Sequence, residues 1–344
     1  MKHVYFKAID AYTKTGEIQA GARELLETVI EREGIRLGAE VPLKVHFGEK
    51  GNQTFIESKN FEGIIAYLQA HNVKSVFMET NALYSGARMN RTQHLALAKE
   101  HGFTQLPVVI ADGEYGDEYA EVEINQKHFK TCKIAKGIAN QRQMIVLSHF
   151  KGHRLAGFGG AIKQLAMGGA ARGGKLAQHV GSKPIINPLT CKKCNACVRH
   201  CPVDAIRIGM LPRIDKKKCI GCAGCMAVCP QKAILFNFFR FFSNTFPEKI
   251  VEYALAAQKN QTNIYLSFAF RMTKGCDCEG RQMKPVVGDL GLFAATDPVA
   301  IDQACLDMID RRAGKRIFGR ARRQLDYAQK IGLGSKNYEL IEIK

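Results

Sequence analysis

Eight cysteines near the middle of the chain have the spacing of iron–sulfur ligands. The first run has gaps of two, two and three residues before a proline: Cys191, Cys194, Cys197 and Cys201. The second run repeats this spacing and its trailing proline: Cys219, Cys222, Cys225 and Cys229. Three thiolates on one short loop can bind three irons of a cubane, whereas the fourth begins a helical turn that points elsewhere. The sequence therefore predicts two 4Fe-4S clusters.

The last cysteine of each run is expected to bind the other cluster, as in bacterial two-cluster ferredoxins. We therefore assign to cluster one Cys191, Cys194, Cys197 and Cys229. Cluster two is expected to use the remaining four: Cys219, Cys222, Cys225 and Cys201. A disulfide framework or a pair of zinc sites is the alternative. Zinc sites, however, use ligands in two pairs rather than in runs of four with a trailing proline.

A second stretch, 148–179, combines basic side chains with many glycines. Gly157, Gly159 and Gly160 are expected to let the backbone approach a ligand and to expose N–H groups for an anion. The stretch matches neither the phosphate loop nor the dinucleotide fingerprint. Lys163 is the best candidate for an anion or cofactor contact. The best candidates for proton transfer or metal binding are His153 and His179. The alternative is a glycine-rich helix-packing region.

Two further cysteines lie one residue apart, at Cys276 and Cys278, with Asp277 between them. They are candidates for a further metal site or a catalytic thiol, because sulfur is a soft ligand. In an extended strand their side chains would point to opposite sides, so chelation requires a bend in the backbone. Packing is the alternative, and we expect Cys132 and Cys305 to be buried, inert cysteines.

The elements around these residues alternate between strand, loop and helix, which predicts a layered α/β sheet. Strands are expected within 3–10, 42–52, 75–80, 107–118, 144–150 and 263–270, with a short strand near 120–125. Helices are expected at 17–33, 58–71, 92–101, near 129–140, near 247–259 and after Pro298. Asp297 and Pro298 form a helix start signal, a capping carboxylate before a proline.

Several predicted strands end in polar loops. These loops contain His46, Glu49 and Lys50; Glu79, Thr80 and Asn81; Asp112 and Glu114; and His149 and Lys151. In open α/β sheets the carboxyl ends of the strands form the ligand crevice. From these loops we select Glu49, Asp112 and His149 as catalytic candidates, and Lys50 together with Arg88 as cofactor-binding candidates.

The cysteine runs interrupt the α/β pattern. We predict a discontinuous α/β domain formed by 1–184 and 237–344, with a two-cluster ferredoxin-like module inserted at 187–236. The phenylalanine-rich segment 236–242 is expected to pack the module against the host domain.

The formal net charge is +18, and seven of the 50 Lys and Arg residues lie between Arg311 and Arg323 without any acid. This stretch could bind nucleic acid, dock an acidic redox partner, or form a solvated helical face. It contains no aromatic platform, which disfavours single-strand binding. No apolar run approaches the ~18 residues of a membrane span, and the start has no signal-peptide pattern. Thiolate ligation of iron needs a reducing compartment, so we expect a cytoplasmic protein.

Many segments together resemble a known family: HFGEKGN, ETNALYSGAR, ADGEYGDE, SHFKGHRLAGFGGAIKQLAMG, the two cysteine runs, CDC and ATDPVAIDQA. They are similar to the uncharacterised iron–sulfur center proteins, a domain of unknown function that often carries a two-cluster ferredoxin insert. The resemblance covers nearly the whole chain and implies two cubane clusters, but it does not supply a reaction.

A more distant resemblance is to the nickel-pincer lactate racemases. His153, the stretch AGFGGAIK with Lys163, and His179 have the spacing of that family's site segment. The resemblance implies a lysine that tethers a pyridinium cofactor and a last histidine that binds nickel. The chain differs from that family at Met167 and Gly168, where the family has proline and glycine. It also carries two cysteine runs that those enzymes lack.

We therefore predict an oxidoreductase that relays electrons from a redox partner protein through two 4Fe-4S clusters to a site in the α/β crevice. An additional metal or anionic organic cofactor could bind there with a small-molecule substrate. The alternatives are a non-enzymatic electron carrier, and an isomerase- or racemase-like enzyme with accessory clusters. A nucleic-acid binder ranks last.

Overall fold

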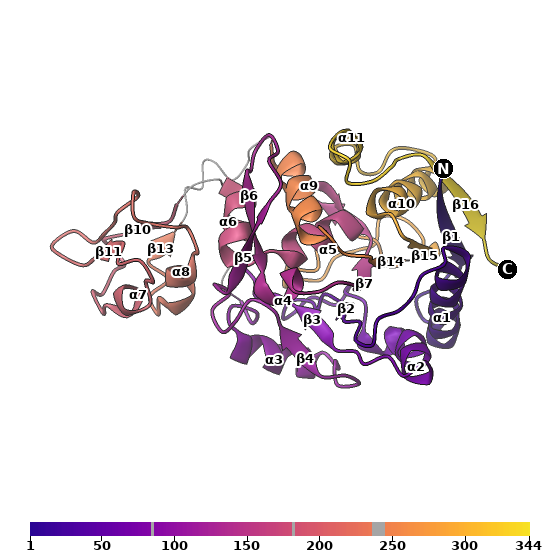
Figure 1. Cartoon of the computed structure of the whole chain (residues 1–344), viewed down its shortest axis with the longest axis horizontal. Coiled ribbons are helices and arrows are strands. Elements are labelled where there is room, and N and C mark those ends of the chain that lie inside the picture. Colours follow the sequence, from indigo (N-terminus) through magenta and orange to yellow (C-terminus); the bar gives the residue numbers. More distant parts are fainter. Residues whose placement is uncertain (84–85, 181–182, 236–244) are drawn as a thin grey trace.

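The structure is a computed structural model that describes residues 1–83, 86–180, 183–235 and 245–344. A mixed sheet, eight-stranded within those residues, lies at its centre (Figure 1). From edge to edge it contains β16 (Tyr338–Glu342), β1 (Lys2–Ala8), β15 (Gly291–Ala295), β14 (Ile264–Ala269), β7 (Ile145–His149), β2 (Leu43–Lys44), β3 (Phe77–Glu79) and β4 (Val108–Ile110). The predicted α/β class is confirmed, with a large mixed sheet.

Five neighbouring strands, β14, β7, β2, β3 and β4, run parallel to one another. Only β15 is antiparallel to both of its neighbours in this sheet. The carboxyl ends of the five parallel strands therefore open at the same edge, where a ligand crevice is expected.

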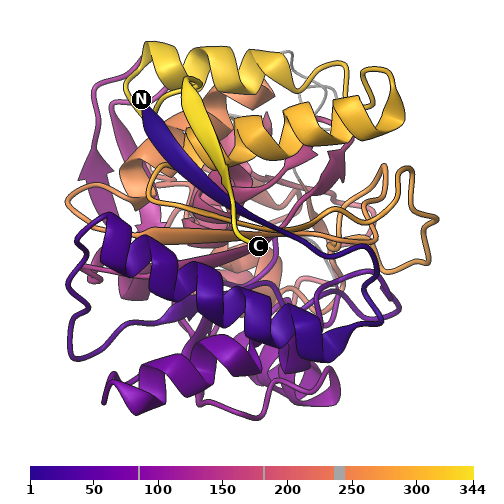
Figure 2. The same cartoon turned by 90° about the vertical axis from the view of Figure 1, so that its right-hand side faces the viewer.

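Helices cover both faces of the sheet. One face packs against α1 (Thr15–Arg32) and α2 (Glu62–Ala70), and the other against α5 (Ala161–Gly169), α9 (Phe246–Ala257) and α10 (Pro298–Ala313). Figure 2 shows the indigo α1 below the sheet and the yellow α10 and α11 (Arg322–Lys330) above it. In β7, Ile145 and Leu147 enter the first core and Val146 the second. This double burial explains why the strand sequence is apolar without alternation.

Most predicted elements form where the sequence placed them, including α3 (Arg91–Glu100) and the single-turn helix η1 (Ser58–Phe61) before α2. The start signal of α10 also forms. The Asp297 carboxylate accepts hydrogen bonds from the N–H groups of Val299 and Ala300 at 2.9 and 3.0 Å. Pro298 occupies the first helical position, where no N–H is needed.

The predicted helix near 129–140 is wrong. Instead, β6 (Thr131–Ala135) pairs antiparallel with β5 (Tyr119–Glu123), and only the four-residue α4 (Lys136–Ala139) follows. Cys132 and Ile134 are fully buried whereas Thr131 is exposed and Lys133 is half-buried. Burial with a period of two is a strand pattern, and it rules out a helix over this segment.

Residues 183–235 form a small lobe beside α6 (Arg172–Val180) in Figure 1. The lobe contains the strand pairs β10 (Ile185–Ile186) with β13 (Ile234–Leu235) and β11 (Ile206–Arg207) with β12 (Arg213–Ile214), and the helices α7 (Ala196–Arg199) and α8 (Gly224–Val228). Positive φ angles recur at equivalent positions of its two halves: Lys193, Asn195 and Asp204, then Gly221, Ala223 and Lys232. The cysteine repeat is therefore also a repeat of backbone conformation.

Three other expectations concern this region or the whole chain. The boundaries 1–184, 187–236 and 237–344 stay predictions. The predicted packing role of 236–242 concerns residues that lie outside the described ranges. Among the helices of the described ranges, none has both the length and the apolar character that a membrane span requires.

Candidate functional site

A cavity of about 670 Å³ opens at the carboxyl edge of the parallel strands. This volume is within the usual range for small-molecule sites. Nine of the predicted site residues line it: His46, Glu49, Lys50, Arg88, His153, Lys163, His179, Cys276 and Cys278. They come from the loops after β2, β3 and β14 and from the glycine-rich stretch. We call this cavity the crevice.

The crevice side of α5 is fixed by a buried aspartate. Asp302 of α10 accepts hydrogen bonds from the N–H groups of Ala161 and Ile162 at 2.7 and 2.9 Å, and so caps the start of α5. A Cβ on Gly160 would lie 2.2 Å from the Asp302 Oδ1, so glycine is required for this approach. Lys163 is thereby held in the first turn of α5, and its Nζ lies 3.1 Å from the Sγ of Cys276.

The backbone bends at Cys276 and Cys278. The N–H of Glu279 donates to the carbonyl of Cys276 at 2.8 Å, which closes a turn. Both thiols consequently line the crevice, rather than pointing to opposite sides as in an extended strand. The hydrogen bond from the Cys278 thiol and the charge of Lys163 hold the pKa of Cys276 well below its ordinary value. Donating that hydrogen bond raises the pKa of Cys278 well above its ordinary value.

His149 does not line the crevice but lies behind the turn. Its Nδ1 is 2.9 Å from the Oδ2 of Asp277, and its Nε2 is 2.8 Å from the carbonyl of Phe270. Lys151 Nζ is 2.5 Å from the same carboxylate oxygen. Burial alone would raise the pKa of Asp277, but His149 and Lys151 hold it well below its ordinary value. This buried ion cluster anchors the residue between the two cysteines.

Asp112 is also buried behind the crevice wall. Its Oδ1 accepts hydrogen bonds from the backbone N–H and the side-chain amide of Asn81 at 2.9 and 3.0 Å. Burial raises the pKa of Asp112 to about 6, although Lys175 opposes this. In this position the carboxylate orders the loop after β3, and its predicted catalytic role stays a prediction.

The two predicted histidines of the glycine-rich stretch converge. Both rings contact Phe246, with centroid distances of 5.9 Å for His153 and 4.8 Å for His179. The N–H of Ala156 donates to the Nδ1 of His153 at 3.0 Å, so its proton is on Nε2. Burial and the charge of Lys163 lower the pKa of His153 well below its ordinary value and that of His179 to about 3. Both imidazoles are therefore neutral.

The opposite wall is mainly cationic. The Nε of Arg88 is 3.1 Å from Glu49, and its Nη1 is 3.2 Å from the Nε2 of His46. Lys175 donates to the Oγ1 of Thr80 and to two backbone carbonyls, at 2.6 to 2.8 Å. Burial lowers the pKa of Lys175 to about 8. The cations of the wall, with Lys50 and Lys163, suit a small anion.

Several positioning residues were missed or undervalued from the sequence. Asp302 caps α5, Phe246 lies against both histidines, and Arg172 binds the crevice loop after β3 from behind. Asp302 had a detectable signal, since it is an acid on an otherwise apolar helix face with Val299, Cys305 and Leu306.

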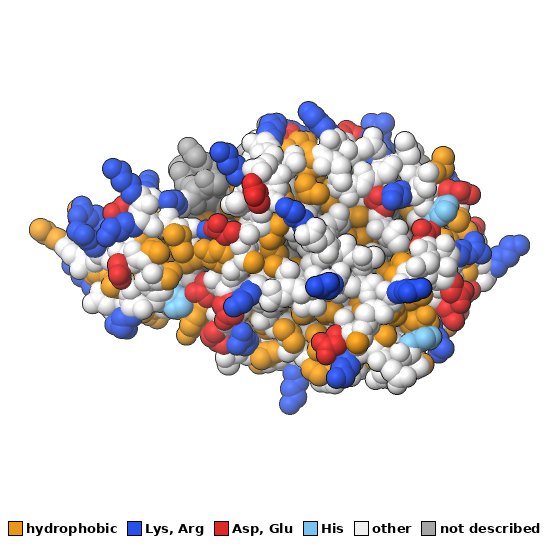
Figure 3. Space-filling view, in the orientation of Figure 1, with side chains coloured by type: hydrophobic (Ala, Val, Ile, Leu, Met, Phe, Trp, Pro, Cys, Tyr) orange, Lys and Arg blue, Asp and Glu red, His pale blue; other side chains and the backbone are white. Residues whose placement is uncertain are grey.

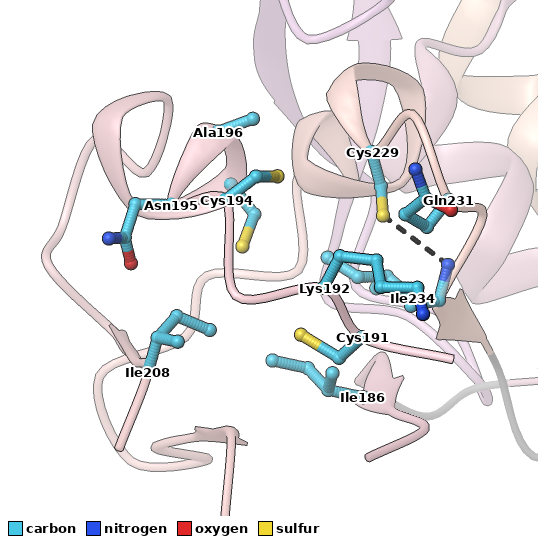
Figure 4. A pocket seen from close by; sticks show the side chains of 12 residues that line it. Ile186, Cys191, Lys192, Cys194, Asn195, Ala196, Ile208, Cys229, Gln231 and Ile234 are labelled. Carbon is cyan, nitrogen blue, oxygen red and sulfur yellow. Dashed lines mark hydrogen bonds between the residues drawn. The ribbon is translucent and has the colours of Figure 1, made fainter. Parts of the chain in front are cut away.

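The eight cysteines of the two runs line two smaller cavities in the lobe. One is lined by four thiols and by Ile186, Ile208 and Ile234 (Figure 4); its cysteines are Cys191, Cys194, Cys197 and Cys229. The cysteines of the other are Cys201, Cys219, Cys222 and Cys225. Each cavity thus takes three cysteines from one run and one from the other.

The chemistry of these cavities fits iron–sulfur cubes. Four soft sulfur donors surround each mostly apolar hollow, and neither hollow is lined by a carboxylate. The N–H groups of Ala205 and Ala233 donate to the Sγ atoms of Cys201 and Cys229, both at 3.3 Å. Hydrogen bonds of this kind stabilise sulfur ligands of clusters and tune their potentials.

One helix separates the second cysteine cavity from the crevice. On α6, Leu176 packs with Leu83 and with Ala223, which lines that cavity. A Cβ on Gly173 would lie 2.4 Å from the carbonyl of Gly221, so this glycine lets the cysteine loop reach the helix. The same helix contributes Lys175 and His179 to the crevice.

Comparison with known proteins identifies the family. Residues 41–307 match the domain of unknown function DUF362. The chain belongs to this family. The predicted resemblance to a domain of unknown function is thereby confirmed, while the iron–sulfur character stays a prediction. No curated protein matches the chain.

Two solved structures are distantly similar. A Thermotoga maritima protein has 8% identity and a TM-score of 0.45, covering 94% of this chain and 60% of its own. The lactate racemase apoprotein from Thermoanaerobacterium thermosaccharolyticum has 12% identity and a TM-score of 0.35, covering 78% of this chain and 51% of its own. The chain therefore spans less than two thirds of either protein, and these similarities carry no argument about its activity.

Proposed function

We propose that this DUF362 protein is an iron–sulfur oxidoreductase that passes electrons through two 4Fe-4S clusters to a small anion in the crevice. The observation that carries the proposal is the crossed set of four cysteines around each cavity of the lobe. Two-cluster ferredoxins bind their cubes with this crossed pattern. The contact of Leu176 with Ala223 supports a path from the second cavity to the crevice.

The chain's own residues would bind and protonate the substrate. Lys50 and Arg88 would hold its negative charge on one wall, facing Lys163 on the other. The neutral His153 and His179 would move protons, because a neutral imidazole both accepts and donates. When bound, the clusters supply single electrons. A bare electron carrier would not require this cationic, histidine-lined crevice.

The lobe also suits an acidic electron carrier as its partner. Residues 183–235 contain ten Lys or Arg and two Asp. Leu189 and Met210 are each 91% exposed. Figure 3 shows blue basic side chains over this lobe, with hydrophobic ones at its outer end. Such a surface steers an acidic partner by charge and buries apolar area on contact.

The basic stretch 311–323 is a weaker candidate for that contact. It lies around α10 and α11, at the other end of the molecule from the lobe in Figure 1. Two of its cations are ion-paired, Arg322 with Asp310 and Arg323 with Glu248, at 3.0 and 2.8 Å. A solvated, partly paired helical surface describes this stretch best.

Iron and sulfide analysis of the anaerobically purified chain tests the proposal. We expect about eight irons and eight sulfides per chain, the content of two cubanes. Cys201→Ser should remove or alter the electron paramagnetic resonance signal of the second cluster. Cys305→Ser, at a buried cysteine of α10 that lines neither cavity, is the matched control and should leave the iron content unchanged. About four irons, or zinc in place of iron, would contradict the proposal.

An isomerase- or racemase-like enzyme with accessory clusters is the second candidate. It is favoured by the convergence of His153 and His179 in the crevice that Lys163 also lines. An organic cofactor tethered to Lys163 would add mass to the peptide containing that residue. Peptide mass spectrometry of protein from its native source separates the two candidates, since the oxidoreductase requires no such adduct.

A further inference from the structure

We propose that Cys276 and Cys278 form a redox-active dithiol in the crevice, a two-electron centre that alternates between a thiolate–thiol pair and an intramolecular disulfide. The inference deepens the proposed function, on which it rests for the source of its electrons. It assigns the crevice a protein-borne group that collects two electrons before they reach a substrate.

The first observation is that both cysteines lie on the same wall of the crevice. The turn closed by Glu279 puts Cys276 and Cys278 together in its lining. Cysteines in an extended strand would be kept apart by the alternation of side chains. Because both thiols face the same cavity, disulfide formation requires a local adjustment of the turn and no movement of the sheet.

The second observation is a charge arrangement that favours the thiolate. The ammonium group of Lys163 lies 3.1 Å from the Sγ of Cys276, which is 2% exposed. Lys163 is itself fixed by the Asp302 cap on α5. A buried thiolate next to a fixed cation is the environment of reactive cysteines, whereas inert buried cysteines have apolar neighbours. Cys305 is of the inert kind, since burial raises the pKa of its thiol.

The third observation is the support beneath the turn. Asp277 is fully buried and is held by both His149 and Lys151. The N–H of Cys276 also donates to the Glu279 carboxylate at 3.1 Å. These contacts fix the residue between the two cysteines, so that the sulfurs can bond and separate while the backbone on either side stays in place. Cys278 is exposed, so its sulfur is accessible to a molecule in the crevice.

The reaction balances with the partners already proposed. In the reductive direction the S–S bond between Cys276 and Cys278 breaks as it takes up two electrons, which two one-electron clusters held by the cysteines of the lobe would supply. One proton is taken up by Cys278, while Cys276 remains a thiolate paired with Lys163. In the oxidative direction the thiolate and the thiol lose two electrons and one proton as the S–S bond forms.

A metal site is the competing use of these two thiols. It would need further soft ligands, whereas the polar partners next to the two cysteines are the ammonium group of Lys163 and the salt-bridged carboxylate of Asp277. The arrangement therefore favours a dithiol.

The test uses the full-length, cluster-loaded chain under anaerobic conditions. It is equilibrated with mixtures of reduced and oxidised glutathione, quenched with acid and alkylated with N-ethylmaleimide. Trypsin cuts after Lys274 and Arg281, so both cysteines are in one peptide, GCDCEGR. We expect two labels on this peptide at high reduced glutathione. At low ratios we expect an unlabelled form that is lighter than the dithiol by two hydrogens.

Variants separate a redox role from a structural one. Cys278→Ser should abolish the unlabelled form and leave one label on Cys276. Lys163→Met should destabilise the Cys276 thiolate and therefore the reduced form of the pair. The ratio of reduced to oxidised glutathione at which half of the pair is reduced should then rise at least ten-fold. Lys59→Met is the control, because that lysine is half exposed and pairs with Glu57, and the half-reduction ratio should not move.

The dithiol is refuted if the peptide carries two labels at every glutathione ratio. It is also refuted if oxidation yields only a glutathione adduct on Cys278. Iron and sulfide are measured on the same samples. If the chain has its full iron and sulfide content but forms no disulfide, this inference alone is wrong. If the disulfide forms reversibly in a chain that binds no iron, the proposed function is wrong and the dithiol is still supported.

Discussion

Arg172 offers the sharpest test of how the crevice is held together. Its side chain is fully buried at the start of α6. The guanidinium donates to the carbonyls of Tyr115 at 2.7 Å and Leu83 at 3.3 Å, and also to that of Met89. Arg172 therefore ties the crevice loop after β3 and the loop after β4 to the helix that also contacts the lobe. We expect Arg172→Met to destabilise the chain and to loosen those loops.

The size of the effect follows from these contacts. Methionine retains much of the apolar stem but leaves three buried carbonyls without this donor, at about 1 to 2 kcal/mol each. The variant also no longer buries a positive charge, which is itself costly, and this offsets part of the loss in unfolding free energy. The net loss in unfolding free energy should be about 2 to 4 kcal/mol. Asp112 should also become harder to ionise, because Arg172 helps to lower its pKa.

Urea unfolding followed by circular dichroism at neutral pH measures this loss, and hydrogen exchange of residues 86–89 measures the loosening. Arg281→Met is the matched control, since that side chain is 67% exposed and pairs only with Glu279 among the described ion pairs. Its effect should stay within about 0.5 kcal/mol. A loss below about 1 kcal/mol for Arg172→Met would refute the structural role given to its three hydrogen bonds.

Three further predictions test other parts of the fold. Gly160→Ala should cost about 1 to 3 kcal/mol because its Cβ would meet the Asp302 carboxylate, whereas Gly16→Ala on an open helix surface should stabilise by about 0.5 to 1 kcal/mol in the same denaturation assay. Asp297→Ala should cost about 1 to 2 kcal/mol through the lost helix cap, and Asp297→Asn less, by thermal unfolding. Burial alone would raise the pKa of Glu248, but hydrogen bonds from Arg323, Lys127 and His128 lower it to about 2. A lowered carboxyl pKa contributes stability above pH 4.5 that is lost as the pH falls toward 2, and Glu248→Gln should flatten this part of the pH profile.

The strand-end residues could be predicted because each directly follows an apolar strand. Parallel strands bring their carboxyl ends to one edge, so His46 after β2 and Thr80 after β3 had to be neighbours of the crevice once the strands were adjacent. The sequence could not say which of these residues face the cavity. His149 and Asp112 turn into buried networks instead, and that depends on partners more than 30 positions away.

The parts that could not be predicted depend on long-range contacts. The bend at Cys276 depends on Asp277 meeting His149, a partner 128 positions away in the chain. The position of Lys163 depends on Asp302, whose carboxylate caps a helix about 140 positions earlier. The strand β6 was missed for a local reason, since its five residues were too short a window to separate a period of two from a helical period.

The two surfaces of α6 connect the two halves of the proposed relay. One surface turns Lys175 and His179 toward the crevice, and the other places Gly173 and Leu176 against the second cysteine loop. A displacement of this helix would therefore change the crevice wall and the cysteine loop together. Because Arg172 fixes the start of the helix to the crevice loop after β3, binding of an anion in the crevice should alter the environment of the second cysteine cavity more than that of the first.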